Sequence, residues 1–202
     1  MNVTHPIAEK LLKRMQTRHN RVVSVADLLN LGSRAAVDQA LSRLVRQGIV
    51  RRVQRGLYEM PRTSTLLHRP ITPSPDALVR AWARKNGLRV VPSGAYAANL
   101  LGLTTQVPAK IVYYTNGRSK TLQLGPYTIK FLNRGPKTMD VQGTYSPLVF
   151  QALRYLGPDK TTPAVLEQLH RNLPDAARAE LQSNLRRSQA WMRPLLQSLI
   201  AT

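Results

Sequence analysis

Closely spaced helix-start and helix-stop residues near the N-terminus restrict the fold more than any other feature of the sequence. Serine suits the N-cap of a helix, because its side-chain oxygen accepts a backbone N–H, and a serine precedes each of two apolar segments here. Glycine suits the position after a helix, and a glycine follows each segment. The pattern predicts two helices in close succession, over residues 25–31 and 33–47, with Ser24 and Ser33 as caps and Gly32 and Gly48 as stops.

Further elements are predicted on both sides of this helix pair. Apolar residues recur at the spacing of one helix face over residues 6–18, and Arg21–Val23 reads as a short extended link. After Gly48, two apolar runs flank a bend at Gly56, which predicts a two-stranded hairpin ending at Pro61. The order of helix, short helix, tight turn, longer helix and hairpin predicts a winged helix-turn-helix.

Charge separates this composition from that of an ordinary globular protein. The 202 residues include 30 Lys+Arg and only 10 Asp+Glu, which gives a formal net charge of +20 and a pI near 11.4. Such a field attracts polyanions, and nucleic acid is the first candidate. An anionic membrane is the competing partner, but it favours a basic amphipathic helix with Trp or Phe on the apolar face, and no clear one is found.

The predicted helix over residues 33–47 has the two faces that a recognition helix needs. Val37, Leu41, Leu44 and Val45 cluster on one side, which predicts that this side packs on the first two helices. Polar and small side chains occupy the opposite side and the N-terminal end. On this basis the candidate DNA-binding residues of the helix are Ser33, Arg34, Ala35, Asp38, Gln39, Ser42, Arg43 and Arg46.

These side chains have the chemistry of groove readout. Gln39 can pair with adenine and Arg43 or Arg34 with guanine, whereas Ala35 can touch a thymine methyl group. Asp38 can accept from cytosine or repel the wrong base, and Ser33 and Arg34 lie where the helix dipole favours a phosphate. On an isolated helix the same face is usually only solvated. Its combination with the turn, the glycine stop and a basic hairpin favours nucleic acid.

The predicted hairpin concentrates positive charge. Three arginines lie within five positions, and their mutual repulsion disfavours a hairpin unless an anion neutralises it. A wing lying along a duplex can bind phosphates with such side chains. The candidate DNA-binding residues of the wing are Arg51, Arg52, Gln54 and Arg55.

The remainder of the chain predicts a second domain. Three prolines and several Ser/Thr make residues 63–75 a linker between a DNA-binding domain over 1–62 and a mixed α/β domain over 76–202. The expected helices of the second domain are 75–86, 93–101, 147–156, 162–171 and 174–199, the last broken at Pro194. The expected strands are 88–91, 110–115, 121–124 and 127–132. The predicted fold class is α+β, with a small antiparallel sheet followed by C-terminal helices.

Nothing in the sequence predicts an active site. The absence of cysteine excludes disulfides, thiolate zinc sites and cysteine nucleophiles. His5, His19, His68 and His170 have no partner at metal-ligand spacing, and no carboxylate pair has the spacing of a nuclease site. Residues 117–121 faintly resemble part of a phosphate loop, but they lie between two strands and read as a hairpin turn. We therefore expect no catalytic residue, no metal and no cofactor.

The N-terminus has no apolar run like that of a signal peptide, and no stretch approaches the length of a membrane span. The expected location is therefore the cytoplasm, with no membrane partner.

Three segments of the sequence resemble a known family. The stretch AVDQALSRLVRQGIVRRVQRGLYEMPR, residues 36–62, is similar to the N-terminal winged helix of the AbiEi-type antitoxins, including the DUF6088 group. The similarity continues through SGAYAANLLGL (93–103) and YYTNGRSKTLQLG (113–125). It covers about residues 20–140, whereas the last part of the chain matches only loosely.

The resemblance implies a particular biology. It implies a transcriptional autorepressor that binds double-stranded DNA at inverted repeats in its own promoter. It also implies that the C-terminal part counters a toxin resembling nucleotidyltransferases, directly or indirectly. The alternative, which the basic second domain favours, is an RNA-binding module that protects tRNA or another RNA.

Overall fold

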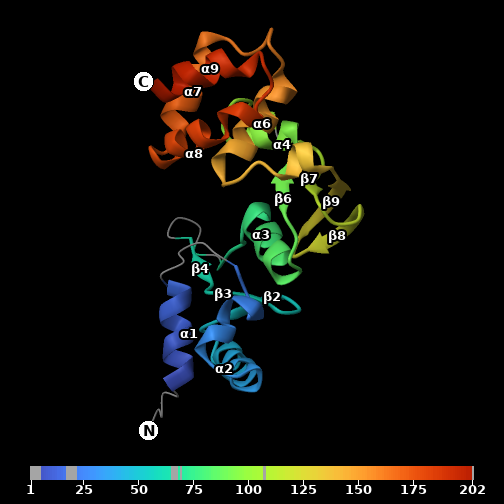
Figure 1. Cartoon of the computed structure of the whole chain (residues 1–202). Helices are drawn as coiled ribbons and strands as arrows, with labels where there is room; N and C mark the ends of the chain where they lie inside the picture. Colours follow the sequence, from blue (N-terminus) through green and yellow to red (C-terminus); the bar gives the residue numbers. More distant parts are fainter. Residues whose placement is uncertain (1–5, 17–21, 65–67, 69, 107, 202) are drawn as a thin grey trace. The chain divides into compact units, whose positions relative to one another are not determined.

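The computed structural model describes residues 6–16, 22–64, 68, 70–106 and 108–201. The end of the first predicted helix, residues 17–18, and Arg21 of the predicted link lie outside the described residues. The chain has an α+β fold and divides into two compact units (Figure 1). The first comprises Met1–Leu88 with Gln123–Tyr127, and the second comprises Arg89–Leu122 with Thr128–Thr202.

The first unit begins with three helical segments and a small sheet. Their bounds are α1 (Pro6–Gln16), β1 (Val23–Ser24), η1 (Val25–Leu31), α2 (Arg34–Arg46), β2 (Arg51–Gln54) and β3 (Leu57–Glu59). The sheet has the order β1-β3-β2 with antiparallel pairs throughout, and Ser24 of β1 lies opposite Leu57 of β3. The β2–β3 hairpin therefore gains a third strand from the segment just before η1.

Residues 25–31 form a 3₁₀ helix, not the α-helix that the apolar spacing favours. Ser24 and Asp27 form a reciprocal capping box: the Asp27 N–H donates to Ser24 Oγ (3.3 Å), and the Ser24 N–H donates to Asp27 Oδ2 (2.9 Å). Ser24 is also part of β1, so the cap fixes the first turn against the sheet. A single short segment held in this way can take the tighter 3₁₀ winding.

The core of this unit lies where the three helical segments meet the sheet. Its buried side chains are Leu11, Met15, Val23, Val25, Leu28, Val37, Ala40, Leu41, Leu44 and Val50. The prediction that Val37, Leu41 and Leu44 face inward is confirmed, since each is at most 3% exposed. Packing therefore fixes the rotation of α2 about its axis.

The segment predicted as a linker is structured in part. Arg62–Thr63 (β4) and Pro70–Ile71 (β5) pair as a two-stranded antiparallel sheet. Helix α3 (Pro75–Lys85) follows, and it contacts η1 and β1 in the first unit. The boundary between the compact units thus differs from the predicted division at 63–75, because the buried face of α3 packs on N-terminal elements.

A four-stranded sheet has the order β6 (Val90–Pro92), β7 (Ile111–Thr115), β9 (Tyr127–Asn133) and β8 (Lys120–Leu124). It belongs to the second unit except for residues 123–127, which belong to the first. The β6–β7 pair is antiparallel as predicted, but β7 and β9 are parallel, so the prediction of an antiparallel sheet is wrong for this pair. Because β9 lies between β7 and β8, the turn at residues 117–121 is not a hairpin turn either. It carries the chain from β7 to the far edge of the sheet.

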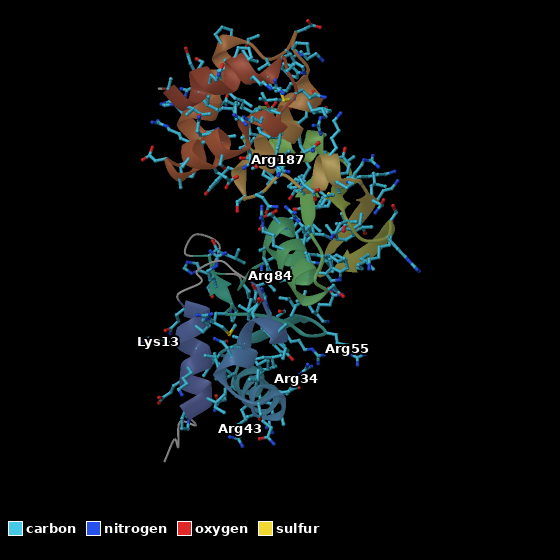
Figure 2. The ribbon with its side chains drawn as sticks, viewed as in Figure 1. Lys13, Arg34, Arg43, Arg55, Arg84 and Arg187 are labelled. Atoms are coloured by element: carbon cyan, nitrogen blue, oxygen red, sulfur yellow. The ribbon has the colours of Figure 1, made fainter. Side chains whose placement is uncertain are left out.

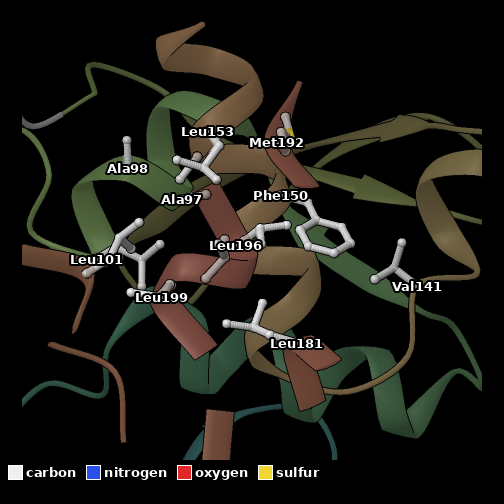
Figure 3. Close-up of a cluster of buried hydrophobic side chains, with 13 residues drawn as sticks. Ala97, Ala98, Leu101, Val141, Phe150, Leu153, Leu181, Met192, Leu196 and Leu199 are labelled. Atoms are coloured by element: carbon white, nitrogen blue, oxygen red, sulfur yellow. The ribbon is translucent and has the colours of Figure 1, made fainter. Parts of the chain in front are cut away.

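Helices form the core of the second unit (Figure 3). They are α4 (Gly94–Leu100), α5 (Pro136–Met139), α6 (Tyr145–Leu156), α7 (Pro163–Asn172), α8 (Ala176–Asn184), η2 (Leu185–Arg187) and α9 (Met192–Ala201). Leu196 of α9 lies near the middle of the cluster in Figure 3, with Phe150 and Leu153 of α6 on two sides of it. A side chain at Gly94 would meet Tyr155 Cβ at 2.6 Å, so glycine is what lets α4 approach α6 closely.

The predicted helix over residues 174–199 is divided at a different place from the one expected. Helix α8 ends at Asn184, and η2 ends at Arg187. The C-cap after η2 is Ser188, whose hydroxyl donates to the Leu185 carbonyl (2.7 Å). Pro194 lies in the first turn of α9, where a missing backbone N–H costs nothing. The break therefore precedes the proline.

Candidate nucleic-acid interface

The outward face of α2 carries the side chains that the sequence assigns to DNA. All eight candidates of this helix are exposed: Ser33, Arg34, Ala35, Asp38, Gln39, Ser42, Arg43 and Arg46. The opposite face is buried in the core of the first unit. The helix thus presents one continuous polar surface to solvent.

Two local interactions order the beginning of α2. Ser33 Oγ accepts the Ala36 N–H (3.3 Å) as an N-cap, which leaves the hydroxyl hydrogen of Ser33 as a donor. Arg34 Nε donates to Asp38 Oδ2 (2.8 Å), and the two side chains are 66% and 46% exposed. An ion pair at this exposure is weak, so Arg34 can exchange its partner for a phosphate at little cost.

The tip of the β2–β3 hairpin lies beside the C-terminal end of α3. Gly56 has φ of +76°, a conformation that favours glycine. Lys85 Nζ donates to the Arg55 carbonyl (2.8 Å), which anchors the tip from α3. Arg52 and Arg55 are both exposed.

These elements enclose a hollow of about 520 Å³ in the first unit, which we call the basic hollow. It is lined by Val25, Ala26, Arg34, Asp38, Arg52, Arg55, Gly56, Tyr58 and Lys85. Four of these residues are cations and one is an acid. Figure 2 shows Arg34 and Arg55 projecting on the same side of this unit, whereas Lys13 projects from α1 on another side. The basic hollow therefore concentrates positive charge beside the exposed face of α2.

Arg51 does not join the other arginines of the hairpin. It lies opposite Glu59 in the sheet register, and its guanidinium donates twice to Glu59 Oε1, with a distance of 2.6 Å from Nε. A third hydrogen bond reaches the Ile71 carbonyl (2.9 Å) on β5. Arg51 thus has a structural role, because these bonds tie β2, β3 and β5 together, and its phosphate contact stays a prediction.

Burial dominates the electrostatics of Glu59. The carboxylate is 10% exposed, and this burial raises the pKa of Glu59 above its ordinary value, although the hydrogen bonds and charge of Arg51 oppose the shift. Arg51 thus supports a carboxylate that is costly to leave without a partner.

Gln54 also differs from its predicted role. The side chain is half-buried, and Oε1 is a buried atom that no group of the described residues hydrogen-bonds. The β2–β3 register shifts between Arg52 and Gln54, and such an irregularity changes the direction of a strand side chain. Gln54 therefore does not present its amide oxygen to a ligand.

Arg84 of α3 organises the base of the hairpin sheet. Its guanidinium donates to both oxygens of Asp27 (3.0–3.2 Å) and to the Val22 carbonyl (2.9 Å). Burial by itself acts to raise the pKa of Asp27, but the hydrogen bonds from Arg84 and Ser24 outweigh it and hold the pKa below its ordinary value. Asp27 is therefore a carboxylate that caps η1 and binds α3 at once.

Sequence reasoning missed three residues around the basic hollow: Tyr58, Arg84 and Lys85. The sequence predicts Tyr58 only as a strand residue. It lines the basic hollow because it pairs with Arg52 and Val23 in the sheet. Arg84 and Lys85 lie in a segment that the sequence assigns to another domain. The only available signal was their position in the last turn of a predicted helix, where basic residues are common anyway.

The described residues contain no group of three His, Asp or Glu side chains placed to hold a metal ion. Two of the four histidines, His5 and His19, lie outside these residues. None of the helices within the described ranges is both long enough and apolar enough to cross a membrane.

The fold and the site define an α+β protein with a basic, partly concave surface on its first unit. By sequence the chain belongs to the DUF6088 family, a family of unknown function, whose model matches residues 7–181. No curated protein matches the chain. Among solved structures, the chain is similar to the crystal structure of the RV2827C protein from Mycobacterium tuberculosis. The sequence identity is 17% and the TM-score 0.44, over 96% of this chain and 80% of that one.

Proposed function

We propose that this chain is a sequence-specific DNA-binding transcriptional regulator whose first unit is a winged helix-turn-helix. The order of α1, η1, α2 and the β2–β3 hairpin supports this, as does the pairing of β1 with β3 at the base of the hairpin. In this proposal α2 is the recognition helix and the hairpin is the wing.

One observation carries the proposal: the basic hollow lies between the start of α2 and the hairpin. Its four cations come from three separate elements, α2, the hairpin and α3. A phosphate in the basic hollow would relieve their mutual repulsion, and it would hold the duplex beside the exposed face of α2. Gln39 and Arg43, one helical turn apart on that face, would then read base edges in the major groove.

The geometry sharpens the roles of the predicted site residues. Arg34, Arg52, Arg55 and Lys85 are the proposed phosphate ligands. Ser33 combines the N-cap of α2 with a free hydroxyl donor. Arg51 and Gln54 are not among these proposed ligands, because one is bound to Glu59 and the other is turned inward.

We further propose that the regulator acts as an AbiEi-like antitoxin. In that role it would repress its own operon by binding inverted repeats in the promoter, and it would counter a nucleotidyltransferase-like toxin. The resemblance of residues 36–62, 93–103 and 113–125 to that group supports this role. A direct test is co-expression with the product of the neighbouring reading frame. Growth arrest by that product that this chain does not relieve would contradict the antitoxin role.

The DNA-binding proposal is tested by gel shifts of the full chain at one salt concentration. The probes are the DNA upstream of its own gene, a scrambled duplex of the same length and tRNA. We expect the upstream DNA to bind most tightly. Tighter binding to tRNA would overturn this order and favour a protein that protects RNA.

A matched pair of variants locates the binding surface in the same experiment. Arg55→Gln removes one charge from the basic hollow, and Lys13→Gln removes one exposed charge from α1. We expect Arg55→Gln to weaken binding to the upstream DNA and Lys13→Gln to leave it nearly unchanged. Equal losses would mean that net charge, not the basic hollow, determines affinity.

A further inference from the structure

A long segment of the chain has no acidic residue at all. Between Asp76 and Asp140 there is no Asp or Glu, yet this segment contains ten of the 30 Lys and Arg residues of the chain. Its formal net charge is therefore half of the total of +20. Most of this segment belongs to the second unit, and it supplies all four strands of the larger sheet.

Side chains on the strands of this sheet alternate between two different environments. On one face, Tyr113 of β7 and Phe131 of β9 are fully buried, and the Tyr113 ring also contacts Tyr96 of α4. The adjacent residues point to the opposite face. There the half-buried Tyr114 lies beside Leu132, and the exposed Lys130 lies beside Val112. This second face thus combines one aromatic ring with positive charge.

Arg134 covers the aromatic ring of that face. Its guanidinium carbon lies 4.8 Å from the centre of the Tyr114 ring. The Arg134 N–H donates to the Thr115 carbonyl (2.9 Å), and Nη1 donates to the Asn133 carbonyl (2.9 Å). The side chain is exposed but held in place at the end of β9. Tyr114 and Arg134 therefore form an ordered cation–π pair.

A further cation lies near this pair. Arg118 is exposed in the turn after β7. The turn is close to Asn133, because Asn133 Nδ2 donates to the Gly117 carbonyl (2.8 Å) and the Asn133 N–H donates to Ser119 Oγ (2.8 Å). Arg118 and Arg134 consequently belong to one edge of the sheet.

We propose that this face of the second unit binds unpaired RNA. A base would stack against the Arg134–Tyr114 pair, and Arg118 and Lys130 would bind the phosphates on either side. Bases in a duplex stack on each other and hide their faces, so a stacking surface favours a single strand. RNA is the favoured strand because it commonly exposes unpaired bases in its loops. This surface shares no residue with the basic hollow, and the proposal does not depend on the proposed DNA binding.

The test measures binding of the full chain to a fluorescent uridine-rich RNA of about 12 nucleotides, which is within the usual site size. A DNA duplex of the upstream sequence is measured in parallel. The variants are Tyr114→Phe and Tyr114→Leu, Arg134→Lys and Arg134→Gln, with Arg186→Gln on η2 as a charge-matched control. Circular dichroism checks folding. Because Arg134 is exposed, Arg134→Lys should fold normally. It therefore tests the proposed RNA binding even if Tyr114→Leu does not fold.

We expect Tyr114→Leu and Arg134→Gln to weaken RNA binding about tenfold each, as the loss of a stacking group does. Tyr114→Phe should bind like the parent chain. Arg134→Lys should bind less tightly because it keeps the charge but loses the flat guanidinium. Duplex binding should change little in all of them. The proposal fails if the parent chain does not bind the RNA, if Arg134→Lys binds as well as the parent, or if Arg186→Gln loses as much as Arg134→Gln.

Discussion

The two basic regions of the molecule differ in what their arginines are bound to. In the first unit, four acids are each paired with an arginine: Asp27 with Arg84, Asp38 with Arg34, Glu59 with Arg51 and Asp76 with Arg80. Residues 90–133, which contain the four strands of the larger sheet, have no acid of their own. A count of basic residues therefore overstates the charge available to a ligand in the first unit. In the strands of the second unit, the number of basic residues is closer to the charge that is available to a ligand.

The largest expected effect comes from breaking the most connected of these pairs. Arg84→Ala should lower the free energy of unfolding by about 3 kcal/mol, because it leaves the Asp27 carboxylate, which is 11% exposed, without its cationic partner. Urea denaturation followed by circular dichroism measures this. Arg46→Ala on the exposed face of α2 is the control, and it should change stability by less than about 0.5 kcal/mol. Equal stabilities for the two variants would show that the pair contributes nothing.

The hairpin provides a sharper contrast between two arginines only four positions apart. Arg51→Ala should lower the free energy of unfolding by about 2 kcal/mol and leave the salt dependence of DNA binding unchanged, because Arg51 is bound to Glu59. Arg55→Ala should do the reverse. It should keep stability and reduce the slope of log K against log salt by about one unit. A reduced slope for Arg51→Ala would place that guanidinium on a phosphate after all.

The outward face of α2 tests whether its exposed arginine reads bases. Arg43→Ala should weaken binding to the preferred duplex by about 1.5 kcal/mol and binding to random DNA far less. Gln39→Ala should relax the preference at a neighbouring base pair. Both variants are measured on both duplexes at one salt concentration. Equal losses on the two duplexes would leave DNA shape or the hairpin to determine specificity.

The smallest expected effect is a dependence of stability on pH. The folded pKa of Asp27 lies below its ordinary value of 3.8, so the unfolded chain takes up the proton first. The stabilisation from Asp27 is therefore complete above pH 3.8, and it is lost as the pH falls through the lower folded value. Urea titrations between about pH 6 and about pH 3 should show the parent chain losing more stability than Asp27→Asn. Parallel curves would mean that the Asp27 pKa is not lowered.

Local sequence signals predicted the helices of the first unit well. Ser33 and Gly48 bound α2 closely, because caps and stops act within a few residues of the chain. The inward face of α2 followed from the helical period, and so did the exposure of all eight candidate residues. These features depend on neighbours in sequence, which a single sequence displays.

The features that sequence reasoning missed depend on partners distant in sequence. The parallel pairing of β7 with β9 could not be predicted, because both connecting turns have hairpin-like sequences and strand order is a tertiary property. The structural role of Arg51 needed the register that places Glu59 opposite it. Arg84 and Lys85 needed the packing of α3 on η1 and β1. A fragment ending at residue 62 would therefore lack Lys85, which anchors the hairpin tip, and Arg84, which binds Asp27 and Val22.

The hydrogen bond from Lys85 to the Arg55 carbonyl affects how much conformational entropy the hairpin tip loses when it binds a ligand. Wings and loops usually lose conformational entropy when they dock, and this loss is subtracted from affinity. Here the tip is already anchored from α3, and Gly56 has no side chain to reorganise beside Lys85. The ordering cost of the tip is therefore met during folding and not on docking. An ammonium group has three donors, so the two remaining N–H groups of Lys85 are still available to an anion.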